Sequence, residues 1–460
     1  MSSMDLRRRL DEVDDSISGL QYTRASLVRQ LNTMAAPACP ILSKLSSEVT
    51  SEIFLHCPSS IGPRDAPMLL LSVCKAWRTI ALSTPKLWAT LNLDFDCLPW
   101  GLFDEKGVEN FVEGWIGRAG SCPLVSQLRV GYMRQEEERR SIPAIIKRLS
   151  SRIQDLELRI DRAGYPEDTP GFPILRSLTL ALPFQRSGDQ VNVLIFNFGA
   201  APQLRKVRMY AGATPSLFAL PWENITAFDG EMLLSKDCAE VLRLAPSLVE
   251  CTLSHPAERA PDTPSVCHST LKSLTLPNSI LSEFLALPVL QYLDLSCATT
   301  DNPHLLPFIS GFSTSLLTLS WTQSLPPAAW LSGMVVLTDL KLTGLSNAYL
   351  TEFFALFDRT KVPESFLPQL QALEPHRCPP YVNAALVDAL ASRCLTAEDG
   401  DARLRSFRQI WPYNTPSDAL EGYYRASGFG TALEELVEKG LEIYIGHATK
   451  TKNPSGWLFN

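Results

Sequence analysis

Residues 289–297, VLQYLDLSC, carry three leucines at a spacing of three and then two: Leu290, Leu293 and Leu295. Successive side chains of a β-strand point to opposite faces, so Leu293 and Leu295 share one face while Asp294 points away from it. The stretch therefore predicts a short strand with one buried face.

The same phrase recurs along most of the chain from about residue 120, as in QLRKVRMYA (203–211), SLVECTLSH (247–255), TLKSLTLPN (270–278) and VLTDLKLTG (336–344). The gaps between its copies mostly fall in the band of about 20–29 residues that is typical of leucine-rich repeats. The first aliphatic residue of each copy is Ile153, Leu175, Leu204, Ile225, Leu248, Leu271, Leu290, Leu316, Leu337 or Leu370.

Helix-like pieces such as SKDCAEVLRLAP and NAYLTEFFALF lie between the phrases, so each unit is expected to form a strand, a turn and a helix. One such unit cannot bury its apolar face alone, whereas stacked neighbours form a continuous core. We therefore expect an α/β solenoid of irregular repeats over residues 122–460, with a cap at its C-terminal end. The alternative is a chance run of leucines in an ordinary α/β domain.

Strand positions between the buried aliphatics are expected on the concave face of the solenoid, where such proteins bind partners. The alternative is a solvated face with no specific role. Aromatic residues dominate binding hot spots, so Tyr292 and Trp321 are the preferred anchors. Our candidates for contact with a protein substrate are Lys206, Arg208, Tyr210, Tyr292, Asp294 and Trp321, with Glu250, Asp339 and Lys341 on the same face.

The N-terminal segment, residues 1–36, has an apolar repeat with alternating spacings of four and three, broken only by Arg24. A period of 3.5 residues over about four heptads predicts a coiled coil, and hence a homodimer through residues 6–31. The alternative is an amphipathic helix packed on its own domain. The seam consists of Leu6, Leu10, Val13, Ile17, Leu20, Leu27 and Leu31.

Residues 37–93 are expected to form a small, all-α domain, and residues 94–121 a linker to the repeats. Two helical stretches, LSSEVTSEIFLHC and MLLLSVCKAWRTIALS, flank a loop rich in Pro, Gly and Ser. In the second stretch Leu69, Leu70, Val73 and Trp77 are expected on one side. A unit of this size has a marginal core, so a partner or the next domain is expected to complete it.

Composition narrows the class of function. The net charge is −7, which disfavours binding to nucleic acid through a broad basic face. No apolar segment is long enough to span a membrane or to act as a signal peptide. The 11 cysteines lack a CxxC pair and suit free thiols in a reducing compartment, so we expect a cytoplasmic or nuclear protein.

Motifs for catalysis are lacking in the sequence. It contains no Gly-Lys dipeptide of a P-loop, no GxSxG elbow and no HExxH helix. The His–Cys neighbours at residues 56–57, 267–268 and 376–378 have no second pair at zinc-site spacing. We therefore expect neither an enzyme nor a bound metal or cofactor.

The stretch ILSKLSSEVTSEIFLHC, followed after a loop by APMLLLSVCKAWRTIALSTPKLW, resembles the F-box as it occurs in large fungal families of F-box-like proteins. The repeats that follow resemble the leucine-rich half of F-box/leucine-rich-repeat proteins. Ser46 stands where the family has a proline, and the loop between the helices is longer than in compact F-boxes. The matching residues are Leu45, Glu48, Val49, Ile53, Phe54, Val73, Cys74, Trp77, Leu87 and Trp88.

The resemblance implies a substrate-recognition subunit of a cullin-based, SCF-type ubiquitin ligase, in which the F-box docks on a Skp-family adaptor. Leu45, Glu48, Val49, Ile53 and Phe54 would then contact the adaptor. Core roles inside the F-box would fall to Val73, Cys74, Trp77, Leu87 and Trp88, with Trp88 joining it to the first repeat. The alternative is a non-catalytic scaffold that self-associates through its N-terminal helix without recruiting a ligase.

Overall fold

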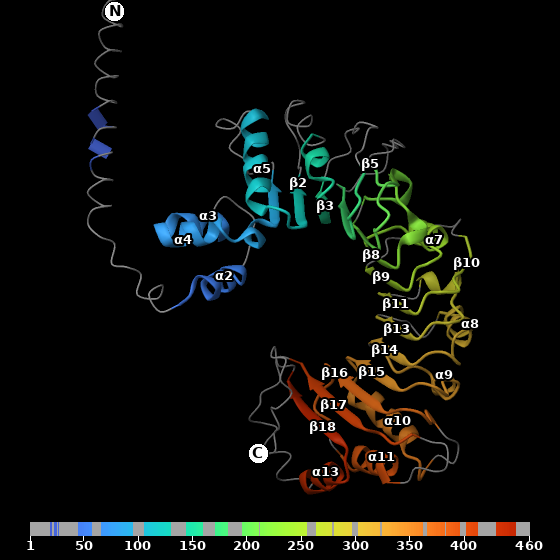
Figure 1. Cartoon of the computed structure of the whole chain (residues 1–460). Coiled ribbons are helices and arrows are strands. Elements are labelled where there is room, and N and C mark those ends of the chain that lie inside the picture. The colour runs from blue at the N-terminus through green and yellow to red at the C-terminus, as the bar shows by residue number, and fades with distance from the viewer. Residues whose placement is uncertain are drawn as a thin grey trace, which may run out of the picture. The chain divides into compact units, whose positions relative to one another are not determined.

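The computed structural model describes residues 19–20, 23–24, 26, 45–57, 66–94, 105–129, 144–159, 171–182, 196–210, 212–254, 264–277, 280–296, 302–322, 324–361, 366–381, 383–395, 402–412 and 429–447 (Figure 1). Contacts divide the chain into two compact units. The helical unit comprises residues 1–92 and 110–122, and the sheet unit comprises residues 93–109 and 123–460. Most of the predicted heptad seam, and with it the predicted homodimer through residues 6–31, lies outside the described residues.

The helical unit contains α2 (Ser47–Leu55), α3 (Ala66–Val73), α4 (Lys75–Leu82) and the 3₁₀ turn η1 (Pro85–Trp88). A further helix, α5 (Glu105–Ala119), occupies much of the segment expected to be a linker. The part of α5 from residue 110 onward belongs to the helical unit. The small domain predicted from residues 37–93 therefore recruits a later helix for its core.

Two polar side chains set where the helices of this unit begin. Ser46 has extended backbone angles and its hydroxyl accepts a hydrogen bond from the Val49 amide at 3.4 Å, which caps α2. Cys74 is likewise extended, with φ −158° and ψ 170°, and its Sγ accepts from the Trp77 amide at 3.5 Å. The stretch predicted as one helix is thus split into α3 and α4 at Cys74.

Two tryptophans form the buried centre of the helical unit. The Trp88 ring lies edge-on to the Trp115 ring of α5, with centroids 4.9 Å apart. The Trp88 Nε1 donates to the Ala81 carbonyl at 2.8 Å, and the Trp115 Nε1 donates to the Trp88 carbonyl at 2.8 Å. Both indole N–H groups are therefore satisfied while their rings are buried, as buried tryptophans require.

From β2 onward, the sheet unit is built around a sheet whose strands follow the chain order, within a mixed α/β architecture. Among the described residues the sheet has 14 strands, and every pair from β2 to β18 is parallel. The strands are β1 (Thr90–Asp94), β2 (Leu124–Arg129), β3 (Ile153–Arg159), β4 (Ser177–Ala181), β6 (Lys206–Met209), β8 (Ala227–Glu231), β9 (Glu250–Ser254), β11 (Ser273–Leu276), β13 (Tyr292–Leu295), β14 (Thr318–Thr322), β15 (Asp339–Thr343), β16 (Ala372–His376), β17 (Ser406–Trp411) and β18 (Glu442–His447).

The connections between strands carry helices and short turns. Figure 1 shows α7, α8, α9 and α10 along the same side of the row of strands. The helices are α7 (Ser235–Leu244), α8 (Leu305–Ser310), α9 (Ala328–Ser332), α10 (Asn347–Phe357), α11 (Ala384–Leu395) and α13 (Phe429–Glu438), and the 3₁₀ turns are η2 (Pro215–Leu217), η3 (Trp222–Asn224) and η4 (Ile280–Glu283). Two small parallel sheets pair β5 (Phe196–Asn197) with β7 (Phe218–Ala219) and β10 (Val266–Cys267) with β12 (Leu285–Ala286).

Burial along most of the strands follows the predicted alternation. On β13, Leu293 and Leu295 are fully buried, whereas Tyr292 and Asp294 are partly exposed. The first aliphatic residues of the recurring phrase, from Ile153 to Leu370, are each at most 2% exposed. We call the opposite face of the strands, which carries Tyr292 and Asp294, the open face. A parallel sheet in chain order, with one buried and one open face, is compatible with a solenoid.

The connection between α10 and β16 is held by a buried arginine on α11. The guanidinium of Arg393, which is 2% exposed, donates from Nε to the Phe357 carbonyl at 2.9 Å and from Nη1 to the Leu367 carbonyl at 3.3 Å. Its Nη2 donates to the Phe366 carbonyl, and its charge lies 4.3 Å from the centre of the Phe357 ring. Arg393 therefore satisfies the carbonyl at the end of α10 and two in the following turn.

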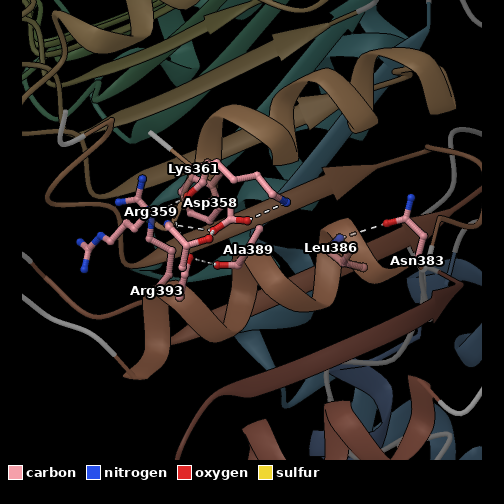
Figure 2. A network of polar contacts seen from close by, with 10 residues as sticks. Asp358, Arg359, Lys361, Asn383, Leu386, Ala389 and Arg393 are labelled. Carbon is pink, nitrogen blue, oxygen red and sulfur yellow. Dashed lines mark hydrogen bonds and ion pairs between the residues drawn. The ribbon is translucent and has the colours of Figure 1, made fainter. Parts of the chain in front are cut away.

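Next to this arginine, Asp358 ends α10 and organises the turn that follows (Figure 2). Its Oδ1 accepts hydrogen bonds from the Thr360 amide at 3.0 Å and the Thr360 hydroxyl at 2.7 Å. Its Oδ2 lies 2.9 Å from the Lys361 Nζ. Burial raises the pKa of Asp358, but the bonds from Lys361 and Thr360 outweigh it and leave that pKa lowered.

Candidate functional site

Helix α2 presents an exposed apolar stripe. Val49 and Ile53 are each 48% exposed and lie one helical turn apart, so they share a face. Glu48 beside them is exposed, and Leu45, just before the helix, is partly buried. Four of the five residues expected to contact an adaptor are thus at least partly accessible in the described part of the chain.

Phe54, the fifth, does not lie on this stripe, and its expected place there was wrong. Its side chain is 1% exposed and packs on Trp77, with ring centroids 4.9 Å apart. Neighbouring residues of an α-helix differ by about 100° in direction. Ile53 therefore faces outward while Phe54 turns into the unit.

Helix α3 carries a second exposed stripe, which the sequence had assigned to the core. Leu69 is 56% exposed and Val73 is 52% exposed, again one turn apart, with Met68 next to them at 37%. The expected core role of Val73 was therefore wrong. Leu70, at 4% exposure, points inward instead. The reason is the break at Cys74, because α3 and α4 no longer share one continuous apolar side.

The remaining residues of the expected F-box core occupy different environments. Leu87 and Trp88 are buried, at 8% and below 1% exposure. Trp77 is partly buried against Phe54. Cys74 is partly exposed and acts as the cap of α4.

A shallow groove of about 550 Å³ lies between α2 and the turn at residues 83–86. Its apolar lining comes from Val49, Leu55 and Pro85, with Glu48, Glu52 and Lys86 also on the lining. Hydrogen bonds from the Ser46 side chain, from the backbone and from Ser47 lower the pKa of Glu48, so its carboxylate stays ionised at neutral pH. The groove thus combines an apolar lining with charged side chains of both signs.

The open face of the sheet unit carries most of the expected substrate contacts. Lys206 and Arg208 of β6, Tyr210 just after it, and Tyr292 and Asp294 of β13 all lie at open-face positions. Glu250, Asp339 and Lys341 occupy equivalent positions on β9 and β15.

Trp321 was expected on this face and is instead buried, with less than 1% of its surface exposed. The register pairs it with Leu295 on β13 and Leu342 on β15, which are buried positions. Its ring lies edge-on to Trp330 of α9 at 6.0 Å, and its Nε1 donates to the Ser324 hydroxyl at 3.3 Å. In the phrase SLLTLSWTQ, Trp321 takes the place of the last inward aliphatic, so alternation alone assigns it to the core.

Charges on the open face form two regions. At the β6 end, the Arg208 Nη2 lies 2.5 Å from the Asp229 Oδ2 on the neighbouring strand β8. Towards β16, the Lys341 Nζ lies 3.4 Å and the His376 Nδ1 3.1 Å from the Glu374 Oε1. Burial and the charge of Lys341 lower the pKa of His376.

Asp294 lies between these two regions. Burial raises the pKa of its carboxyl group, and the Ser320 hydroxyl and the charge of Lys341 only partly offset this. Burial and the neighbouring Asp294 raise the pKa of Tyr292. The centre of the open face therefore holds a poorly solvated carboxylate beside an aromatic ring.

Glu374 and His376 were missed as open-face residues, although the weak phrase QLQALEPHR places both at alternating positions. Among the described residues, no group of three or more His, Cys, Asp or Glu side chains is arranged to hold a metal ion. Over the same residues, no helix is long and apolar enough to cross a membrane. No model of a known protein family matches the chain, and no curated protein matches it.

Proposed function

We propose that the chain is a substrate-recognition subunit of a cullin-based, SCF-type ubiquitin ligase. In this proposal, the helical unit acts as an F-box that docks on a Skp-family adaptor. The sheet unit acts as an irregular leucine-rich-repeat domain and binds the target protein. Ubiquitin transfer belongs to the enzyme that the ligase recruits, so the chain itself needs no catalytic site. Such complexes act in the cytoplasm and the nucleus.

The observation that carries the proposal is a pair of exposed apolar stripes. They lie on α2 and α3, two short helices that follow one another in the chain. Val49 and Ile53 on α2, and Leu69 and Val73 on α3, are each about half exposed, whereas Phe54 of the same unit is buried. Each of these four exposed side chains would contribute up to about 2 kcal/mol of hydrophobic free energy if a partner covered it fully. Apolar stripes on short helices are typical of protein interaction surfaces.

The stripes also revise which residues would meet the adaptor. The exposed set is Val49, Ile53, Leu69 and Val73, with Met68 and Glu48 beside it. Phe54 moves to the core and Val73 moves from the core to the surface. Ser46, which stands in place of the family's proline, caps α2 with its hydroxyl and so replaces the helix-starting role that proline would have.

A capture assay with purified Skp-family adaptor tests the proposal. The full-length chain with Val49→Asp and Ile53→Asp is expected to lose adaptor binding, because two carboxylates would be placed in an apolar interface. Leu69→Asp with Val73→Asp should have the same effect. Val437→Asp is the matched control, since Val437 is 40% exposed on α13 of the sheet unit.

Wild-type chain that captures neither adaptor nor cullin would refute the docking proposal. Capture that is equal for the wild type and both double variants would refute the assignment of the surface. Self-association without adaptor binding would favour the scaffold alternative. Thermal melting of each variant shows whether the helical unit is still folded.

A further inference from the structure

The registers of five adjacent strands place large and small side chains in alternation across the open face. Glu250 of β9 pairs with Ser273 of β11, which pairs with Tyr292 of β13. Tyr292 pairs with Thr318 of β14, which in turn pairs with Asp339 of β15. Adjacent strands are about 4.8 Å apart, so Glu250, Tyr292 and Asp339 follow one another in steps of about 10 Å.

A second row lies two residues further along each strand. It runs through Thr252, Thr275, Asp294, Ser320 and Lys341. On both rows, the intervening strands β11 and β14 contribute only serine or threonine. Short hydroxyl side chains therefore separate the carboxylate of β9, the Tyr292–Asp294 pair of β13 and the carboxylate of β15.

The charge on these rows is mainly negative. Glu250, Asp294 and Asp339 are spread over β9 to β15, and the one cation on the two rows of these strands, Lys341, lies 3.4 Å from Glu374 on β16. The Asp294 carboxylate is partly desolvated, with a raised pKa, so an incoming cation would stabilise its ionised form. This surplus of carboxylates favours a positively charged ligand.

We propose that strands β9 to β15 of the open face bind an extended segment of a partner protein that carries Lys or Arg at every third residue. An extended polyproline II segment has three residues per turn and rises about 3.1 Å per residue, so every third side chain returns to the same side after about 9.3 Å. That distance matches the spacing of Glu250, Tyr292 and Asp339 along the first row, and Asp294 lies two residues further along β13. The ring of Tyr292 offers a surface for the segment's prolines or cations.

The inference rests on the proposed function, since it names the class of target segment that the sheet unit would select. The proposed binding differs from a general attraction of basic peptides, because it requires a positive charge at every third residue of the segment. A partner rich in phosphate or carboxylate groups is disfavoured by the same carboxylates.

The test uses the full-length chain and two labelled peptides of identical composition at about 0.15 M salt, where charges further apart than about 8 Å are screened. One peptide repeats Lys-Pro-Pro triplets, and the other has its lysines in one block followed by prolines. The triplet peptide is expected to bind about tenfold more tightly by fluorescence anisotropy. The combined change Glu250→Gln, Asp294→Asn and Asp339→Asn should weaken it by about tenfold or more.

Glu240→Gln is the matched control, because Glu240 lies on α7, away from the open face, and should leave the affinity unchanged. Asp294→Asn alone is nearly isosteric and should give a smaller loss in the same direction, which keeps the test valid if the triple variant folds poorly. The inference is overturned by absent binding of the triplet peptide, by equal affinity for the two lysine peptides, or by tighter binding of Glu-Pro-Pro triplets.

Adaptor capture with the same open-face variants separates this inference from the proposed function. Retained capture without peptide binding overturns only the charge-spacing inference. Loss of capture by the α2 and α3 variants concerns only the docking surface of the helical unit.

Discussion

Phe54 of α2 and Trp77 of α4 stack at a tilt, with ring centroids 4.9 Å apart and an interplanar angle of 54°. This contact joins α2 to the helix that follows the break at Cys74. It also divides α2 into a core side, with Phe54 at 1% exposure, and a surface side, with Ile53 at 48%. Two adjacent residues of one helix therefore have separate tasks, and their substitution should have separate effects.

Phe54→Ala is expected to lower the free energy of unfolding of the helical unit by about 3–5 kcal/mol, since it removes a buried aromatic side chain and leaves a cavity. Ile53→Ala is the matched control and should cost less than about 1 kcal/mol. Urea titration with tryptophan fluorescence measures both. Similar losses for the two variants would contradict the assignment of Phe54 to the core.

Trp321→Ala is expected to destabilise the sheet unit by about 3–5 kcal/mol, because Trp321 fills the space between the sheet and Trp330 of α9. Tyr292→Ala on the open face should cost less than about 1 kcal/mol. Denaturant unfolding measures the pair. A Tyr292 variant as unstable as the Trp321 variant would show that the two faces are assigned wrongly.

The strands could be predicted from the sequence because their signal is local and has a period of two. Each copy of the phrase contains its own pattern, and the first aliphatic residues proved to be buried along the whole series. Trp321 is the exception, because its aromatic character suggests a binding anchor whereas its position in the strand is an inward one. Alternation along the strand predicts that Trp321 points to the same inward face as Leu319, and both side chains are buried.

The helical unit was harder to predict because short helices depend on where they are capped. The cap at Cys74 turns Val73 outward, and no periodic pattern in the stretch MLLLSVCKAWRTIALS marks that break. The use of α5 in the core depends on Trp115, which lies 27 residues from its hydrogen-bond partner Trp88. Contacts between distant residues of this kind are not encoded in any local spacing.

Asp237 predicts a pH dependence of stability. It lies in the first turn of α7 at 6% exposure, and burial raises its pKa from 3.8 to about 6. Between these values the unfolded chain releases its proton while the folded chain keeps it. The folded state is therefore destabilised as the pH rises through this window. Since a pKa difference of one corresponds to about 1.4 kcal/mol, the loss of stability above pH 6 reaches up to about 3 kcal/mol.

Asp237→Asn removes the ionisation and is expected to stabilise the protein more at pH 7.5 than at pH 4.5. Removal of a carboxylate that forms a salt bridge would instead destabilise the protein more at pH 7.5. Denaturant titrations at the two pH values measure the difference. Glu352→Gln on α10 is the control, because Glu352 is exposed, and it should change stability by less than about 0.5 kcal/mol. A gain that is equal at both pH values would exclude the raised pKa as its cause.

Arg393→Met is expected to destabilise the C-terminal part of the sheet unit by about 3 kcal/mol or more. The variant keeps most of the side-chain volume but leaves the carbonyls of Phe357, Phe366 and Leu367 without their donor, and each unsatisfied buried group costs about 1–3 kcal/mol. Arg393→Lys should recover only part of this loss, because an ammonium group lacks the planar fork that reaches three carbonyls.

Arg408→Met is the matched control, since Arg408 is exposed on β17 and its charge lies 5.8 Å from the centre of the Tyr444 ring. It should cost less than about 1 kcal/mol. Thermal melting ranks the three variants, and hydrogen exchange of the amides in α10 and α11 locates the loss. Unchanged protection of these helices in Arg393→Met would show that the three carbonyls find other donors, and the proposed anchoring of α10 by Arg393 would be wrong.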